Sequence, residues 1–142
     1  MKRDYSTFAK GNSQSVREGK DFSLPELTKL CKENPNIVFG DFSKFYANSD
    51  ALTYAYENIK SKPGNMTPGI TKETLDAIDI KWFQKMEKEL QHGTYKFKNI
   101  RRIYIEKPNS KDKRPLGISS PRDKIVQRSL AQALTRVYEP QF

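Results

Sequence analysis

The chain has 142 residues, enough for one domain of ordinary size and too few for a large multidomain enzyme. Hydrophobic residues make up 35% and charged residues 30%, which predicts a thin core and surfaces covered by solvent or by a partner. No apolar run exceeds three residues, so we exclude a membrane-spanning segment and expect neither a cleaved secretory signal nor a membrane partner. A single cysteine and a single histidine exclude an internal disulfide and a four-ligand zinc site.

Positive charge is concentrated in the second half of the chain. The formal net charge is +9, whereas residues 1–60 are nearly balanced, with 9 basic against 8 acidic side chains. Three aromatic residues, Tyr95, Phe97 and Tyr104, alternate with the later cations, a pattern typical of contact with phosphates and unpaired bases. An acidic protein partner is the alternative. A basic helix on a membrane surface fits poorly, because the cations fall on mixed strand, turn and helix signals.

The first part of the chain predicts an arm followed by two short helices. Residues 1–22 are polar and show no hydrophobic period, which predicts a flexible arm. Ser23 can cap a helix through Asn34 whose apolar side includes Leu27 and Cys31, and we expect Cys31 to be a small buried side chain. Another helix starts at Ser49, with apolar residues at helical spacing, and stops before a Lys-Pro-Gly sequence.

A loop and a longer apolar stripe complete the N-terminal part. Residues 62–70 contain two prolines and two glycines and must form a loop. Thr71 can cap one helix that ends at Gly93, or Asp79 can cap a shorter helix and split the span in two. The members of the stripe that we expect in the core are Trp82, Phe83 and Met86.

Beyond Tyr95 the period changes to two, which predicts a basic β-hairpin with a cationic tip. Ile103 and Ile105 alternate with polar residues as in a half-buried strand, and residues 114–118 can return as a second strand. Pro115 limits this second strand to an edge position or to irregular pairing.

A final helix opens with Ser120 as cap and Pro121 at the first helical position. The fold class we expect is α+β: a mostly helical part at residues 23–93, then a hairpin and a helix at residues 94–142. Part of the apolar face of the last helix should be covered by a protein partner or stay exposed. That face consists of Val126, Leu130, Leu134 and Val137.

Three motifs occur in order between Lys62 and Phe142: KPGNMTPGITKETLD, then HGTYKFKNIRRIYIEKPNSKDKRPLGISSPRDKIVQRSL, then YEPQF. They resemble the start of the reverse transcriptases (maturases) encoded by group II introns, covering the N-terminal extension and the first fingers block. Two features depart from the family pattern. Asn99 stands in place of a proline, and Ile118-Ser119-Ser120 replaces an IPT-like tripeptide, which puts in doubt how the hairpin joins the helix.

The resemblance implies partial reverse transcriptase fingers with the palm absent. Polymerisation needs two metal ions held by carboxylates, and in the family these aspartates lie in palm blocks beyond this chain. We therefore expect no catalytic residue, no metal, no cofactor and no polymerisation by the chain alone. In such enzymes the hairpin offers a Lys and an Arg to the incoming triphosphate, here Lys107 and Arg114, although generic phosphate contact explains them equally well. The resemblance also implies that a loop of the N-terminal extension helps to bind RNA, and here this loop contains Asn65, Thr67 and Gly69.

RNA binding without catalysis is the function that we predict, with intron or ribosomal RNA as partner and an organellar, for example mitochondrial, location. The chain can be one piece of a split maturase, an excised part of a longer enzyme, or a structural component of an organellar ribonucleoprotein such as a mitochondrial ribosome. A protein-binding adaptor with a basic face is the alternative from another functional class. The residues expected to contact phosphate are Lys98, Arg101, Arg102, Lys107, Lys111, Lys113, Arg114, Arg122, Lys124 and Arg128.

Overall fold

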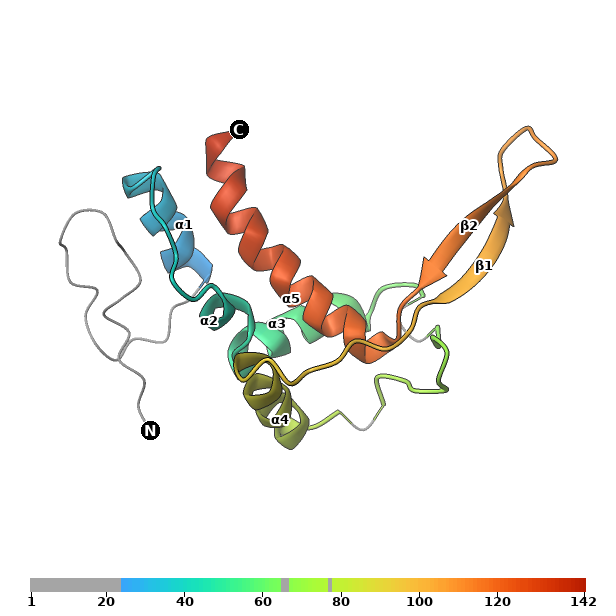
Figure 1. The fold of residues 1–142 in the computed structure, drawn as a ribbon, viewed down its shortest axis with the longest axis horizontal. Helices are drawn as coiled ribbons and strands as arrows, with labels where there is room; N and C mark the ends of the chain where they lie inside the picture. Colours follow the sequence, from blue (N-terminus) through green and yellow to red (C-terminus); the bar gives the residue numbers. More distant parts are fainter. Residues whose placement is uncertain (1–23, 65–66, 77) are drawn as a thin grey trace.

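A computed structural model of the chain describes residues 24–64, 67–76 and 78–142 (Figure 1). The arm expected at residues 1–22, the cap at Ser23 and the loop residue Asn65 lie outside these ranges. The described part combines helices with one antiparallel hairpin, which confirms the α+β class. The elements are α1 (Leu24–Glu33), α2 (Ser43–Tyr46), α3 (Ser49–Lys60), α4 (Ile80–Gln91), β1 (Arg101–Glu106), β2 (Lys113–Ile118), α5 (Pro121–Tyr138) and the 3-10 helix η1 (Glu139–Gln141).

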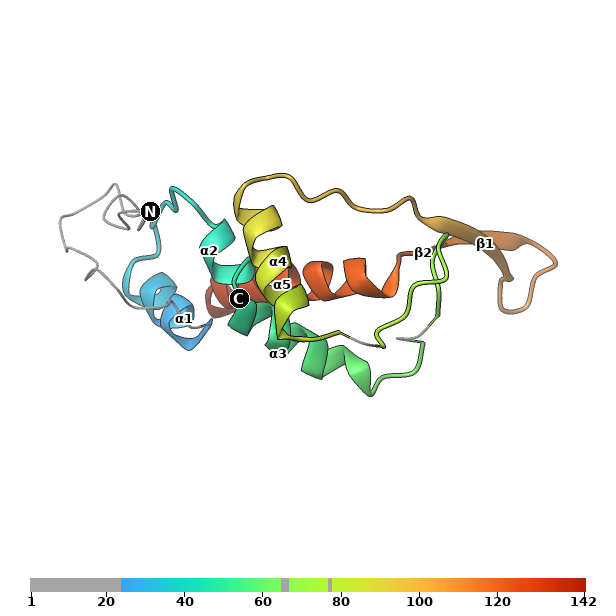
Figure 2. The ribbon, with the colours of Figure 1, turned by 90° about the horizontal axis from the view of Figure 1, so that it is seen from below.

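Helix α5 is the element against which α1, α2 and α3 pack, while α4 packs mainly on α3 (Figures 1 and 2). Its 18 residues give it a length of about 27 Å at the α-helical rise. As predicted, Pro121 is its first residue and the Ser120 side chain caps it by accepting the backbone N–H of Asp123 at 3.2 Å. Helices α1, α2 and α3 lie along α5, and the hairpin leaves from its first turn, at the end opposite α1. None of the described helices is long and apolar enough to cross a bilayer.

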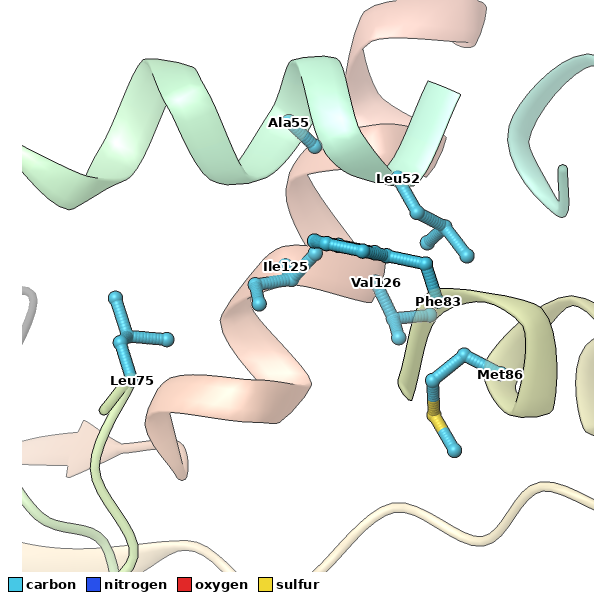
Figure 3. Packing of buried hydrophobic residues seen from close by; sticks show 7 residues of the cluster. All are labelled: Leu52, Ala55, Leu75, Phe83, Met86, Ile125 and Val126. Carbon is cyan, nitrogen blue, oxygen red and sulfur yellow. The ribbon is translucent and has the colours of Figure 1, made fainter. Parts of the chain in front are cut away.

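The larger hydrophobic cluster lies where α3, α4 and the first turns of α5 meet (Figure 3). The Phe83 ring packs edge-on against Tyr56 and Trp82, with ring centroids 5.9 and 5.2 Å away. The expected core positions of Phe83 and Met86 are confirmed, while Trp82 is half-buried against the same cluster. The fully buried members are Leu52, Ala55, Leu75, Phe83, Met86, Ile125 and Val126.

A second cluster joins α1 and α2 to the C-terminal half of α5. Leu27 and Cys31 are buried as predicted, and they meet Phe45 of α2 and Ala133 of α5. Burial raises the pKa of the Cys31 thiol, which keeps it neutral and unreactive. Helix α2 was not predicted, because its four residues are too few to show a hydrophobic period.

Helix α4 corrects one expectation, because Thr71 does not cap a helix. The Asp79 side chain accepts the backbone N–H of Trp82 at 2.9 Å, so the helix begins at Ile80 as the alternative reading proposed. The preceding segment is irregular, since the Thr74 hydroxyl accepts the backbone N–H of Asp76 at 3.2 Å and holds a local turn instead. The expected stop at Gly93 is confirmed by its left-handed backbone, with φ of 69°.

The apolar face of α5 is covered only in part by the chain itself, and part of it stays exposed, as expected from the sequence. Val126 is 2% exposed and Ala133 is fully buried, whereas Leu134 is 38% exposed. The Ser129 hydroxyl, also buried, donates to the Tyr46 carbonyl at 2.7 Å and fixes α2 against the helix. The helices of this chain therefore cover the Val126 end of this face, and a protein partner over the exposed part stays a prediction.

Candidate nucleic-acid interface

Strands β1 and β2 form an antiparallel hairpin that projects away from the helices (Figures 1 and 2). We call residues 101–118 the basic hairpin. Its pairing runs from Arg101 opposite Ile118 to Glu106 opposite Lys113, close to the predicted strands. At the tip the Lys107 N–H donates to the Asp112 carbonyl at 3.0 Å, and Asn109 adopts a left-handed φ of 61° to close the turn.

The alternation of the strands gives the basic hairpin two different faces. Ile105 is paired with Arg114, and Lys107 follows two residues after Ile105, so Lys107 and Arg114 belong to the same face. That face also carries the half-buried Ile103 and the exposed Leu116. The opposite face bears Arg102, Tyr104, Glu106 and Lys113. The register thus brings together the two residues that the family resemblance pairs.

The cations of the basic hairpin point largely into solvent. In the described part of the chain, none of their side chains makes an ion pair with an acidic residue. Arg101 is half-buried and its Nε lacks a hydrogen-bond partner. The exposed members are Arg102, Lys107, Lys111, Lys113 and Arg114.

Three of the four remaining predicted residues are held in contacts within the chain, whereas Arg128, further along α5, has a buried Nε without a hydrogen-bond partner. Lys98 Nζ lies 2.5 Å from Glu73 Oε1, and Lys124 Nζ donates to the Gly64 carbonyl at 3.1 Å. Burial lowers the pKa of Lys124. The Arg122 guanidinium lies 5.9 Å from the centre of the Trp82 ring, within cation–π range. The predicted set is therefore divided between the solvent-facing hairpin, three cations below the hairpin that already have partners, and Arg128 on α5, which has none for its Nε.

Asp123 anchors the segment that leads into the basic hairpin, a role that sequence reasoning missed. The side chain is 2% exposed; it accepts the hydroxyl of Tyr95 and, at 2.9 Å, the backbone N–H of Lys98. Burial, followed by the hydrogen bond to Asp123, raises the pKa of the Tyr95 hydroxyl. Asp123 was not among the predicted residues, yet its position three residues before Val126 on the apolar side was a signal of burial.

The loop that the family resemblance connects with RNA lies against the start of α5. A Cβ on Gly69 would come within 2.9 Å of the Ser120 nitrogen and 3.0 Å of its Cα, both backbone atoms that cannot yield easily. Gly69 is therefore required for close approach of two backbones. Thr67, partly exposed, lies in the same loop. The loop, the anchored segment and the basic hairpin thus meet near the first turn of α5.

Within residues 24–64, 67–76 and 78–142, no group of three or more His, Cys, Asp or Glu side chains is placed to hold a metal ion. The expected lack of catalytic residues, cofactors and polymerase activity stays a prediction.

No protein-family model matches the chain. It is 40% identical over 134 residues to the putative COX1/OXI3 intron 1 protein of Saccharomyces cerevisiae, which covers 91% of this chain and 16% of that protein. The uncharacterized 91 kDa protein in cob intron of Schizosaccharomyces pombe is 39% identical over 142 residues, covering 99% of this chain and 17% of that protein.

A bacterial relative decides the family. The group II intron-encoded protein LtrA of Lactococcus lactis subsp. cremoris is 36% identical over 119 residues, covering 84% of this chain and 20% of that protein. The chain is a homologue of group II intron-encoded proteins. The resemblance inferred from the motifs is confirmed, and the chain spans between 16% and 20% of the length of these three relatives.

Proposed function

We propose that the chain is an RNA-binding part of a group II intron reverse transcriptase or maturase and does not polymerise nucleic acid alone. The observation that carries the proposal is the basic hairpin, which holds its exposed cations outside the helical body without acidic partners among the described residues. Such cations can contact phosphates and release counterions without first breaking an internal interaction. The homology to group II intron-encoded proteins supports intron RNA as the partner.

The contacts in the structure support two different roles among the predicted residues, phosphate contact and positioning of the hairpin. The exposed cations of the basic hairpin contact phosphate, while Lys98, Arg122 and Lys124 hold the base of the hairpin in position, because their side chains already have partners. Lys107 and Arg114 share a face and can engage one phosphate group together, as an ammonium point charge and a two-pronged guanidinium.

The larger organisation is part of the same proposal. In it residues 23–93 form a helical N-terminal extension, and residues 94–142 form the start of a fingers-like unit that a palm elsewhere completes. Two relatives are named for introns of COX1 and cob, which supports an organellar setting for this chain.

The test compares two variants of equal net charge. One replaces Lys107, Lys111, Lys113 and Arg114 by Gln. The matched control replaces four exposed lysines on α1 and α4 by Gln, which keeps helix propensity similar. RNA affinity is measured by fluorescence anisotropy on single-stranded RNA over a series of salt concentrations. The control lysines are Lys29, Lys32, Lys81 and Lys88.

Each phosphate contact to single-stranded nucleic acid contributes about −0.7 to the slope of log affinity against log salt, so losing all four makes the slope shallower by about 3. The control variant should keep the wild-type slope. Equal losses in both variants would overturn the assignment to the basic hairpin. A wild-type protein that does not bind RNA but binds an acidic protein would support the adaptor function instead. Crosslinking of the protein to ribosomal RNA in the cells that produce it would support the role as a ribonucleoprotein component.

A further inference from the structure

An open pocket of about 310 Å³ lies between α3 and α5, bordered by the start of α1 and by η1, and it is separate from the basic hairpin. The hairpin joins α5 before Pro121, whereas the pocket residue Gln132 lies about 17 Å further along the helix. Its volume is at the low end of small-molecule sites, which suits one nucleotide and not a folded peptide. Its lining includes Leu24, Tyr54, Arg128, Gln132, Arg136 and Glu139.

Two polar atoms in this wall are buried without a hydrogen-bond partner. They are Arg128 Nε, a donor, and Gln132 Oε1, an acceptor. A buried polar group without a partner costs free energy, and a ligand that offers both an acceptor and a donor would satisfy both atoms. Other lining groups are already engaged, since Asn58 Nδ2 donates to the Tyr54 carbonyl and Thr135 Oγ1 to the Ala131 carbonyl, each at 2.8 Å.

The remaining lining groups define the chemistry of the ligand. Two guanidiniums, Arg128 and Arg136, favour an anionic group such as a phosphate. The Tyr54 ring is 50% exposed and offers a flat surface on which a base can stack. The carboxylate of Glu139 and the oxygen of Gln132 are both acceptors, so the ligand must also present hydrogen-bond donors.

We propose that this pocket binds one unpaired RNA nucleotide whose base carries an exocyclic amino group. The base stacks on Tyr54 and donates its amino hydrogens to Gln132 and Glu139, while its phosphate meets Arg128 and Arg136. Cytosine, adenine and guanine fit this pattern better than uracil, because uracil lacks an amino group and offers only its N3–H to the two acceptors. The inference rests on the proposed RNA-binding function. It adds a second RNA contact that recognises a base, whereas the basic hairpin contacts only the phosphate backbone.

The experiment uses the full chain and three RNA stems that differ only in one bulged position: cytosine, uracil or no bulge. A bulged base is already unpaired, so inserting it into a pocket costs little. We expect the cytosine bulge to bind about tenfold more tightly than the fully paired stem, the magnitude of one stacked base, and the uracil bulge to bind more weakly than cytosine. Tyr54→Leu should abolish this preference, whereas Tyr54→Phe, which keeps the ring, should retain it.

A second variant separates base recognition from folding stability. Gln132→Leu removes the unpartnered acceptor, so it should leave thermal stability unchanged or higher while reducing the preference for cytosine over uracil. If the wild-type protein binds the three stems equally and the variant with four Gln in the basic hairpin loses affinity, the nucleotide-binding role of the pocket is refuted and the proposed function still holds. A protein that binds none of the stems would overturn both. An unchanged cytosine preference in Tyr54→Leu would also refute the pocket.

Discussion

Replacing Asp123 by Ala tests whether this side chain anchors the segment before the basic hairpin. The substitution removes two accepted hydrogen bonds, from the Tyr95 hydroxyl and the Lys98 N–H. Hydrogen bonds to a charged group contribute roughly 1.5–3 kcal/mol each, and the half-buried Tyr95 hydroxyl regains some of its bond from water. We therefore expect the free energy of unfolding to fall by about 3 kcal/mol, a large part of the 5–15 kcal/mol typical of a domain.

The assay is urea denaturation followed by circular dichroism, applied to Asp123→Ala, Tyr95→Phe and the double variant. If the two side chains are bonded, their effects are not additive, and the double variant should lose about 1–2 kcal/mol less than the sum of the single losses. Additive losses would refute the Tyr95–Asp123 bond. A loss below about 0.5 kcal/mol for Asp123→Ala, the range of ordinary surface substitutions, would refute the anchoring role itself.

Other predictions concern packing, backbone and pH. Gly69→Ala should lower stability by about 1–3 kcal/mol in thermal denaturation, because its Cβ meets the Ser120 backbone. Gly93→Ala should cost about 1 kcal/mol in the same assay, and Gly93→Asn less, since φ is 69°. Ile125→Val should cost about 0.5–1.5 kcal/mol in urea denaturation, whereas Leu134→Ala should cost less because that side chain is exposed. The raised pKa of Tyr95 stabilises the fold fully below pH 10.0 and less as the pH rises further, so the wild type should lose stability more steeply than Tyr95→Phe in alkaline denaturation.

Local signals in the sequence were sufficient to predict the main elements. The Ser120-Pro121 start of α5, the Asp79 cap and the Gly93 stop depend on chemistry within a few residues, and each is found in the structure. The alternation of Ile103 and Ile105 likewise predicted the half-buried face of β1. The spacing of apolar residues could not decide between Thr71 and Asp79 as the cap. Leu75 lies between them and is buried in the core, and its side chain reaches the core from an irregular segment as well as it would from a helix.

Contacts between distant parts of the chain could not be predicted. The sequence identified Lys98, Arg122 and Lys124 as cations, but whether they face solvent depends on Glu73, Trp82 and Gly64, which only the fold brings near. For the same reason the pocket was missed, since its walls come from α1, α3, α5 and η1. Composition predicted how much positive charge the chain carries, and the tertiary structure determines how much of that charge is exposed and without an acidic partner.

Among the residues that the structure describes, the two-stranded sheet leaves both β1 and β2 as edge strands with unpaired backbone groups along their outer sides. Such edges are templates for pairing with a second copy of the same chain, and natural proteins protect them with like charges and proline. Pro115 removes one donor from β2, and the surrounding cations repel an identical hairpin. The charges that we assign to RNA therefore also prevent self-association, so high salt without RNA should favour aggregation through this sheet.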